Sequence, residues 1–257
     1  MAKSISSLNS TKSDRPPITL IYSVDGWGKT SLGAEFPDPI YLHTEGEEPP
    51  NDVELPTPGV LTSFDELLTL IGELVTEEHE HKTVIIDSLD GIEPLLWAAT
   101  CERLKIGSIE EAGFGRGYVE ADKEWQDLLG GLAALKQRGI AVVMLAHPEI
   151  VRFDSPTSDP FSRYGVKLHK RASALVREKS DIVAFGNFRM VLKEKEVGPK
   201  KKIAHGEGGG ERQIHLEERP GFVAKNRYNM KTSMVYKKGE GYKELQKFFP
   251  APTGVVA

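Results

Sequence analysis

Cysteine is nearly absent from this chain of 257 residues, in which Cys101 is the only one. A single cysteine excludes an internal disulfide framework, and with seven scattered histidines it leaves no zinc-binding cluster. Low cysteine usage suits a reducing compartment. We expect Cys101 to be a packing residue, with a catalytic thiol as the alternative.

Long apolar runs and an excess of positive charge are also missing. No run approaches the roughly 20 apolar residues that span a bilayer, so we expect no membrane insertion. Residues 1–17 are rich in Ser and Lys and have no apolar segment typical of a secretory signal. The 38 acidic residues outnumber the 33 Lys and Arg residues, which gives a net charge of −5. Nucleic acid is therefore not attracted to the chain as a whole, and only a local basic surface could bind it.

The chain does contain an alternation of short apolar runs with helical patterns. This alternation predicts an α/β fold, with a mostly parallel central sheet flanked by helices on both faces. We expect strands at residues 18–22, 40–43, 83–87, 141–146 and 182–187. We expect helices at residues 29–36, 64–75, 93–104, 120–137 and 168–179.

The last third of the sequence changes character. Residues 189–196 and 213–217 alternate as strands do and predict a C-terminal β-hairpin with a flexible tip at 198–210, followed by a strand at 222–225. Residues 148–166 are expected to form a long irregular loop, which is usually functional or disordered. The predicted organisation is a flexible arm at 1–16, one core at 17–236 and a peripheral tail at 237–257.

Residues 23–30 read Ser-Val-Asp-Gly-Trp-Gly-Lys-Thr and lie between an expected strand and an expected helix, as a P-loop does. Its glycines let backbone N–H groups approach phosphate oxygens, its Lys reaches the β- and γ-phosphates of ATP, and its Thr hydroxyl holds Mg²⁺. The expected nucleotide-binding residues are Ser23, Asp25, Gly26, Trp27, Gly28, Lys29, Thr30 and Ser31. The strict motif has Gly where this chain has Ser23, and an ordinary Gly-containing turn is the alternative.

Asp87 supplies a second signal of the same kind. It ends the apolar run 83–87, where a carboxylate holds Mg²⁺ through water in P-loop proteins. Asp87 and Thr30 are therefore the expected metal-binding pair. The alternative is that Asp87 only caps the helix that follows it.

With both signals in view, the chain resembles the RecA-like ATPases of tailed bacteriophages, and more narrowly the Sak-four type, which is associated with single-strand annealing and recombination. The resemblance lies in residues 22–32, 83–96, 115–125, 145–147, 163–175 and 217–228. It implies a RecA-like P-loop core, ATP and Mg²⁺ as cofactors, and the cytoplasm of a bacterial host cell as the location.

The resemblance also implies catalytic residues. A general base follows the strand after the P-loop helix, which makes Glu45 the candidate, with Glu47 and Glu48 as competitors. His147 is placed where a polar residue senses the γ-phosphate. Lys225 and Arg227 resemble paired cations that are inserted into a neighbour's ATP site. Solvated loop acids, a core histidine and a basic strand end are the respective alternatives.

RecA-like cores bind single strands through two loops, which by order are residues 107–118 and 148–166. The second region and the helix start after it carry basic side chains interleaved with Phe153, Phe161 and Tyr164, so phosphate contacts and base stacking are both expected. The expected DNA-binding residues are Arg152, Arg163, Lys167, His169, Lys170 and Arg171. A solvated helix face is the alternative, and it is the preferred interpretation of the Lys run 200–202.

The leading hypothesis is an ATP-dependent protein that binds single-stranded DNA, self-assembles into a filament or ring, and promotes annealing or strand pairing in phage homologous recombination. A single-strand-binding protein is a possible further partner. One alternative is a RecA-like motor or switch that acts on a protein without binding DNA. Another is a structural protein that binds nucleotide without hydrolysing it.

Overall fold

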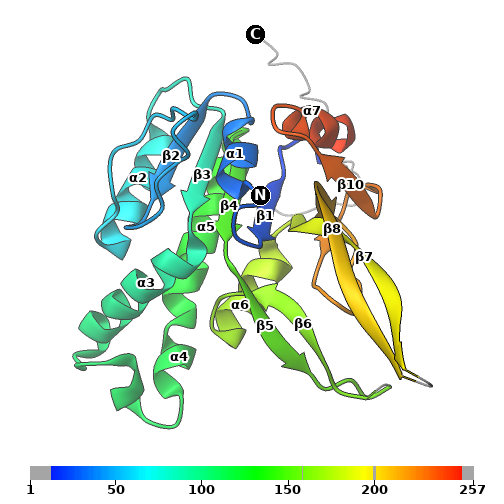
Figure 1. Ribbon diagram of the computed structural model, residues 1–257. Coiled ribbons are helices and arrows are strands. Elements are labelled where there is room, and N and C mark those ends of the chain that lie inside the picture. Colours follow the sequence, from blue (N-terminus) through cyan, green and yellow to red (C-terminus); the bar gives the residue numbers. More distant parts are fainter. Residues whose placement is uncertain (1–12, 158, 199–200, 251–257) are drawn as a thin grey trace, which may run out of the picture.

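The computed structural model describes residues 13–157, 159–198 and 201–250, with side chains described outside 190–209. Most of the predicted arm and the end of the predicted tail lie outside these residues, as does Lys200 of the lysine run. The fold is built on one eight-stranded sheet with the order β10-β8-β7-β1-β4-β3-β2, and β9 also pairs with β7 (Figure 1). A separate two-stranded hairpin is formed by β5 and β6.

The centre of the sheet is parallel. It consists of β1 (Ile18–Ser23), β2 (Pro39–His43), β3 (Thr83–Asp87), β4 (Ala141–Ala146) and the first part of β7 (Ile182–Gly198). Antiparallel pairing adds β8 (Lys201–His215), β9 (Lys225–Asn226) and β10 (Ser233–Tyr236). The predicted α/β fold with a mostly parallel central sheet is confirmed.

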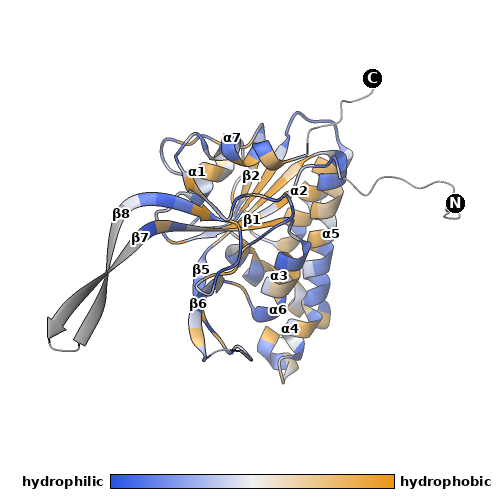
Figure 2. Cartoon of the chain, turned by 90° about the vertical axis from the view of Figure 1, so that its right-hand side faces the viewer, coloured by the Kyte–Doolittle hydropathy of each residue, from blue (hydrophilic) through white to orange (hydrophobic). Residues whose placement is uncertain are grey.

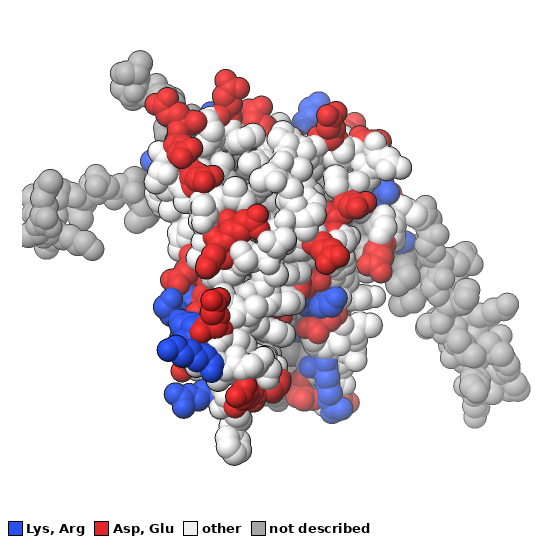
Figure 3. Space-filling view, turned by 90° about the vertical axis from the view of Figure 1, so that its left-hand side faces the viewer, with Lys and Arg blue, Asp and Glu red and all other residues white. Residues whose placement is uncertain are grey.

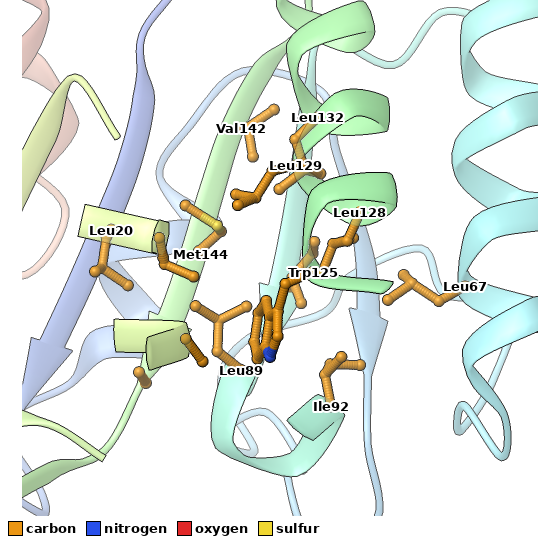
Figure 4. Close-up of a cluster of buried hydrophobic side chains, with 14 of the residues drawn as sticks. Leu20, Leu67, Leu89, Ile92, Trp125, Leu128, Leu129, Leu132, Val142 and Met144 are labelled. Carbon is orange, nitrogen blue, oxygen red and sulfur yellow. The ribbon is translucent and has the colours of Figure 1, made fainter. Parts of the chain in front are cut away.

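Helices cover both faces of the sheet, because successive strand residues point to opposite sides. Leu20, Val142 and Met144 face α2 (Phe64–Thr76), α3 (Leu89–Leu104), α5 (Asp122–Arg138) and α6 (Lys170–Lys179). Figure 4 shows Trp125, Leu128 and Leu132 of α5 against Val142 and Met144 of β4. On the other face, Ile21, Val143 and Leu145 pack with α1 (Lys29–Ala34) and α7 (Gly241–Leu245). In Figure 2 the strands between these layers are predominantly hydrophobic.

Helix starts follow local capping chemistry. The hydroxyl of Ser63 accepts a hydrogen bond from the Glu66 N–H at 3.2 Å, as a capping box does, although the Glu66 carboxylate returns to the Thr62 N–H rather than to Ser63. Ser88 caps α3 in the same way by accepting from the Gly91 N–H at 3.2 Å. Because of this cap α3 begins at Leu89, four residues earlier than the sequence pattern predicts.

Three predicted loops contain regular structure instead. Residues 148–166 form an antiparallel hairpin of β5 (Pro148–Phe153) and β6 (Phe161–Val166), so the prediction of an irregular loop is wrong. Neither strand has a strict alternation of apolar and polar residues, and proline and short polar residues lie between the two strands, so the sequence pattern does not indicate a hairpin. Residues 107–118 contain a 3₁₀ turn, Ile109–Ala112, and the start of α4 (Arg116–Glu120). The hairpin tip predicted at 198–210 is shorter in the structure, because β8 begins at Lys201 and pairs there with Gly198 of β7.

The segment from Tyr236 to Tyr242 packs against α1. Glu35 is the C-cap residue of α1. Its carboxylate accepts hydrogen bonds from the Tyr236 hydroxyl at 2.9 Å, the Gly239 N–H at 2.7 Å and the Tyr242 N–H at 3.0 Å. Phe36 contacts the Tyr242 ring, with 4.7 Å between ring centroids. The P-loop helix is therefore held by residues some 200 positions later in the chain.

Candidate functional site

The P-loop lies at the carboxyl edge of the parallel strands, where ligands bind in open α/β sheets. Ser23 ends β1, is buried, and pairs with Gly186 of β7 in the ladder. Its φ angle is not positive, so a Cβ at this position causes no backbone strain. The positive φ angles fall on Gly26 (70°) and Gly28 (98°), where glycine has no steric penalty.

Trp27 fixes the P-loop to the sheet. Its side chain is fully buried, and its indole N–H donates to the Asn187 carbonyl at 3.1 Å. A Cβ at position 186 would lie 2.6 Å from the Trp27 ring, so Gly186 makes this contact possible. On its other side Trp27 contacts Tyr236, with ring centroids 4.9 Å apart. The Trp27 side chain therefore packs between the P-loop and the sheet and does not point toward the phosphate-binding side of the loop.

Thr30 and Asp87 meet as predicted for a magnesium site. The Thr30 hydroxyl donates to Asp87 Oδ2 at 2.7 Å, and the Tyr41 hydroxyl lies 3.0 Å from the same oxygen. Asp87 is fully buried, and its Oδ1 has no hydrogen-bond partner among the described residues. Burial raises the pKa of the Asp87 carboxyl, while Lys29 and the Thr30 hydroxyl oppose this shift.

These residues fit Mg²⁺, which proteins usually bind through one or two side-chain oxygens, water and the phosphates of a nucleotide. The Thr30 hydroxyl would hold the ion directly, and the unpartnered Oδ1 of Asp87 would accept from a metal-bound water. Among the described residues, no group of three or more His, Cys, Asp or Glu side chains forms a metal site on its own.

Lys29 contacts His147, which follows β4. Lys29 Nζ lies 3.0 Å from His147 Nε2, and His147 Nδ1 lies 2.9 Å from Asp90 Oδ2. A lysine ammonium can only donate hydrogen bonds, so His147 Nε2 is the acceptor in the contact with Lys29. The ring proton is then on Nδ1, which donates to the Asp90 carboxylate. This hydrogen bond to Asp90 raises the pKa of His147, whereas burial and Lys29 lower it. Burial alone would raise the pKa of Asp90, but hydrogen bonds from His147 hold it at about 2.

The acidic loop after β2 contributes a different carboxylate from the one predicted. Glu47 Oε2 lies 3.8 Å from Lys29 Nζ, and its Oε1 lies 3.6 Å from His147 Nδ1. The Glu47 side chain is half-buried, whereas Glu45 and Glu48 are exposed. Glu45 still lines the cleft described next. The structure thus brings Glu47, the competitor in the sequence, closest to the P-loop lysine.

An open cleft of about 720 Å³ lies beside the P-loop. This volume is in the range of ~300–1,000 Å³ that is usual for ligand sites. Its lining is mostly polar and comes from segments that follow β1, β2, β3, β4 and β6, from the first turn of α3 and from the start of β5: Val24, Asp25, Thr44, Glu45, Glu47, Ser88, Asp90, Gly91, His147, Pro148 and Lys167. The site residues predicted near Ser23–Thr30, Asp87 and His147 are therefore brought together at one edge of the sheet.

Lys225 and Arg227 lie elsewhere. Lys225 is in β9 and Arg227 directly follows it. This strand pairs with the start of β7, at the opposite end of the parallel strands from the P-loop. The Lys225 ammonium donates to the Arg177 carbonyl at 2.6 Å, and Arg227 pairs with Asp181 at 3.4 Å. The side chain of Arg227 stays 58% exposed. These two cations cannot reach the P-loop of their own chain.

The six predicted DNA-binding residues form two groups. Arg152 and Arg163 lie on the β5–β6 hairpin, where Arg152 pairs with Asp154 and Arg163 with Glu218. The other four surround the start of α6. Lys167 lies 3.5 Å from Asp90, and the His169 ring stacks on Tyr118 with centroids 4.2 Å apart. Lys170 is exposed, and Arg171 pairs with Asp122.

Glu93 makes a buried contact that predicts a pH effect. Both of its carboxylate oxygens lie 3.0 Å from the His169 N–H, and burial is the main reason that its pKa rises from 4.5 to about 7. Between these values the unfolded chain loses the proton while the folded chain keeps it, so this group makes the chain less stable as pH rises. The loss totals roughly 3 kcal/mol and levels off above pH ~7.

Replacing Glu93 with glutamine is therefore expected to remove this slope. Urea unfolding at several pH values would show the stability of Glu93→Gln relative to the parent chain rising by roughly 3 kcal/mol between pH ~4.5 and ~7.5. If the amide itself changes the free energy of unfolding by a fixed amount, the curve of stability against pH shifts as a whole and its slope does not change. Glu73→Gln, at an exposed position of α2, serves as the control. A pH-independent difference between Glu93→Gln and the parent would contradict the expectation.

Three residues of the site carry no signal in the sequence. Tyr41 and Asp90 act through contacts with residues that lie 46 and 57 positions away in the sequence. Gly186 matters only because Trp27 packs on it. A tyrosine in a strand or an aspartate in a first helical turn is ordinary, so only the arrangement of the strands reveals their roles.

The site has a glycine-bearing loop, with a lysine and a hydroxyl at the start of the following helix. It also has a buried carboxylate at the end of a nearby strand. These features define a P-loop nucleotide-binding protein. A family model described as an AAA domain, AAA_24, matches residues 15–228. The chain belongs to this family of P-loop ATPases. The comparison with curated proteins found no match. Within the described residues no helix is both long and apolar enough to cross a membrane.

Proposed function

We propose that this chain is an ATP-dependent protein that binds single-stranded DNA, self-assembles, and promotes annealing or strand pairing in phage homologous recombination. The resemblance in the sequence supplies the biological setting. ATP and Mg²⁺ are the proposed cofactors, and a single-strand-binding protein is a proposed additional partner.

One observation carries the proposal: the P-loop lysine connects to the basic hairpin through two residues. Lys29 contacts His147, and His147 contacts Asp90, which lies 3.5 Å from Lys167 Nζ. The Lys167 N–H also donates to the His147 carbonyl at 2.9 Å. The β5–β6 hairpin therefore begins and ends at the histidine that touches Lys29.

This connection gives ATP a route to the DNA-binding region. A γ-phosphate at the P-loop would attract Lys29, so His147 Nε2 would lose its partner. Protonation of Nε2, which the hydrogen bond to Asp90 favours by raising the pKa of His147, would then let this nitrogen donate to the phosphate. A shift of His147 would move Asp90 and Lys167 with it. Nucleotide binding would thus rearrange the base of the hairpin, and loss of the γ-phosphate would reverse the change.

The chain's own residues support hydrolysis as well. Bound Mg²⁺ would neutralise charge on the phosphates. The Thr30 hydroxyl and Asp87 would position the ion, and Lys29 would stabilise charge that develops on the transferred phosphoryl group. Glu47 is the carboxylate that would orient and polarise the attacking water, in place of Glu45.

Self-association would complete the site. Lys225 and Arg227 lie at the sheet edge opposite the cleft, so a head-to-tail neighbour is the geometry that brings them to an ATP site. Cations supplied in trans in this way typically raise hydrolysis rates by 10³–10⁵. ATP turnover is therefore expected to rise with protein concentration.

The proposal is tested by fluorescence anisotropy of a labelled oligo-dT, with and without ATP and Mg²⁺, at two salt concentrations. Binding is expected to require ATP, to weaken as salt rises, and to disappear in Lys29→Ala. Lys247→Ala, which removes a surface lysine paired with Glu244, is the control and should bind normally. An absence of binding in every nucleotide state would refute the DNA function and favour a protein partner.

A further inference from the structure

A second cavity, of about 210 Å³, lies between the β5–β6 hairpin and α6. Lys170, Ser173 and Arg177 line it from α6, and Arg163 lines it from β6. The three α6 positions are spaced i, i+3 and i+7, which places them on one face of the helix. Three cations and a hydroxyl from two elements thus converge on a single cavity.

Arg163 is held in the wall of this cavity. Its side chain is only 13% exposed, one guanidinium nitrogen donates to Glu218 at 2.7 Å, and its central carbon lies 3.9 Å from the Phe153 ring centroid. Its Nε is buried without a hydrogen-bond partner among the described residues. A buried donor without an acceptor is unfavourable, and an anionic ligand in the cavity that Arg163 lines would place an acceptor beside it.

Two carboxylates partly offset the three cations: Glu149 in the lining, and Glu218, which lies beside the cavity and pairs with Arg163. Glu149 is the one acidic residue of its lining, and burial is the largest influence raising the pKa of this carboxyl. The remaining walls are uncharged and come from Val151, Gly165, Val166, Leu168 and Val223. By contrast, the face shown in Figure 3 carries more acidic than basic side chains. The helix α2 on that side has exposed acidic residues at Asp65, Glu66 and Glu73. An approaching polyanion would therefore be repelled from that face and attracted to this one.

We propose that this cavity is a phosphate-binding site that holds a single phosphate group, supplied by the backbone of a single strand. Guanidinium groups match phosphate oxygens through paired N–H donors, and the Lys170 ammonium adds a point charge. The cavity lies below the ~300 Å³ that is typical of sites for whole small molecules, so it suits one phosphate rather than a nucleotide. The assignment of the strand as the source rests on the proposed function.

The site adds Arg177 to the DNA-contacting residues and gives Arg163 a specific role. It also directs the strand. A backbone phosphate in the cavity would lie beside β6, and the next part of the strand would pass the start of α6, where Lys167 and Arg171 are located. DNA would then contact the segment that His147 connects to the P-loop.

The test uses the full chain and compares Lys170→Gln and Arg177→Gln with Lys179→Gln. Lys179 lies on the same helix and is exposed, but it does not line the cavity. Salt titrations of oligo-dT binding, in the presence of ATP and Mg²⁺, give the slope of log Kd against log salt. Each cavity variant should lower this slope by about 0.7, the value for one phosphate contact in a single strand. Lys179→Gln should leave it unchanged.

A second arm separates the sources of phosphate. Thermal unfolding of the parent chain is compared in inorganic phosphate and in chloride at equal ionic strength. If the parent chain binds no oligo-dT, stabilisation by phosphate that disappears in both cavity variants still supports a phosphate site, with free phosphate as the source. The DNA function would then have failed while the site stands.

The proposal is overturned if both cavity variants match Lys179→Gln in the DNA titration, or, where DNA does not bind, if phosphate gives no stabilisation that depends on Lys170 and Arg177. Lys170 is exposed, so its replacement keeps the test valid if Arg177→Gln does not fold.

Discussion

Replacing Glu47 with glutamine is expected to lower ATP turnover by about 10²–10⁴-fold, the usual contribution of a positioned general base, while ATP binding persists. Of the three candidate acids in the loop after β2, Glu47 lies nearest the P-loop lysine, 3.8 Å from Lys29 Nζ and 3.6 Å from His147 Nδ1. Glutamine keeps the shape of the side chain but has no negative charge with which to polarise water. Steady-state hydrolysis and binding of a fluorescent ATP analogue, measured on the same preparations, would separate these effects.

Glu45→Gln provides the matched control. Glu45 lines the same cleft, but it is exposed and is the residue that the sequence favours as the base. We expect its replacement to change turnover only severalfold. If Glu45→Gln lost turnover and Glu47→Gln kept it, the base would be Glu45 and the assignment drawn from the structure would be wrong. If both variants kept turnover, neither carboxylate would be the base.

Replacing Trp27 with alanine is expected to destabilise the fold by about 3–5 kcal/mol, as loss of a buried tryptophan usually does. The ring is fully buried between Gly186 and Tyr236, and its N–H donates to the Asn187 carbonyl. Its loss would also free the loop that places Lys29. We therefore expect the melting temperature to fall by roughly 2–4 °C for each kcal/mol lost, and nucleotide affinity to fall with it.

Two variants control this prediction. Trp97→Ala removes a half-buried indole that packs on Tyr118 away from the P-loop, so it should lower stability less and leave nucleotide affinity unchanged. Trp27→Phe keeps an aromatic ring but not the indole N–H, so most of the stability should remain. Differential scanning fluorimetry with and without ATP reports both quantities. A Trp27→Ala chain with the parent's melting temperature and affinity would contradict the role given to this ring.

The parts of the molecule that could be predicted from sequence are those set by local pattern. Five parallel strands, the glycine-bearing loop at residues 23–30 and the carboxylate at Asp87 each have a signature within a few residues. The order of strand ends then places these elements at one edge, because parallel strands share their carboxyl side. That is why Thr30 and Asp87, 57 positions apart, were expected to meet.

The features that were missed depend on contacts between distant segments. Asp90 matters because it accepts a hydrogen bond from Nδ1 of His147, and Tyr41 because its hydroxyl lies beside Asp87. To prefer Glu47 over Glu45 as the general base, one must know the backbone path of the loop after β2. The hydrophobic pattern of the sequence does not determine that path. The β5–β6 hairpin escaped prediction for a different reason. It is half-exposed, so its two strands mix charged and apolar residues and lack the long apolar runs of the central strands.

The bonds that Glu35 accepts from Tyr236, Gly239 and Tyr242 have a consequence for how the protein is made. A ribosome releases the P-loop helix early, but the segment that holds this helix emerges some 200 residues later. Domains generally fold as units once their parts are available. A nascent chain that ends before Tyr236 would contain every residue of the nucleotide site without the support that shapes it. The ability to hold ATP would therefore arise late in synthesis, and a translation product cut short would not compete for nucleotide.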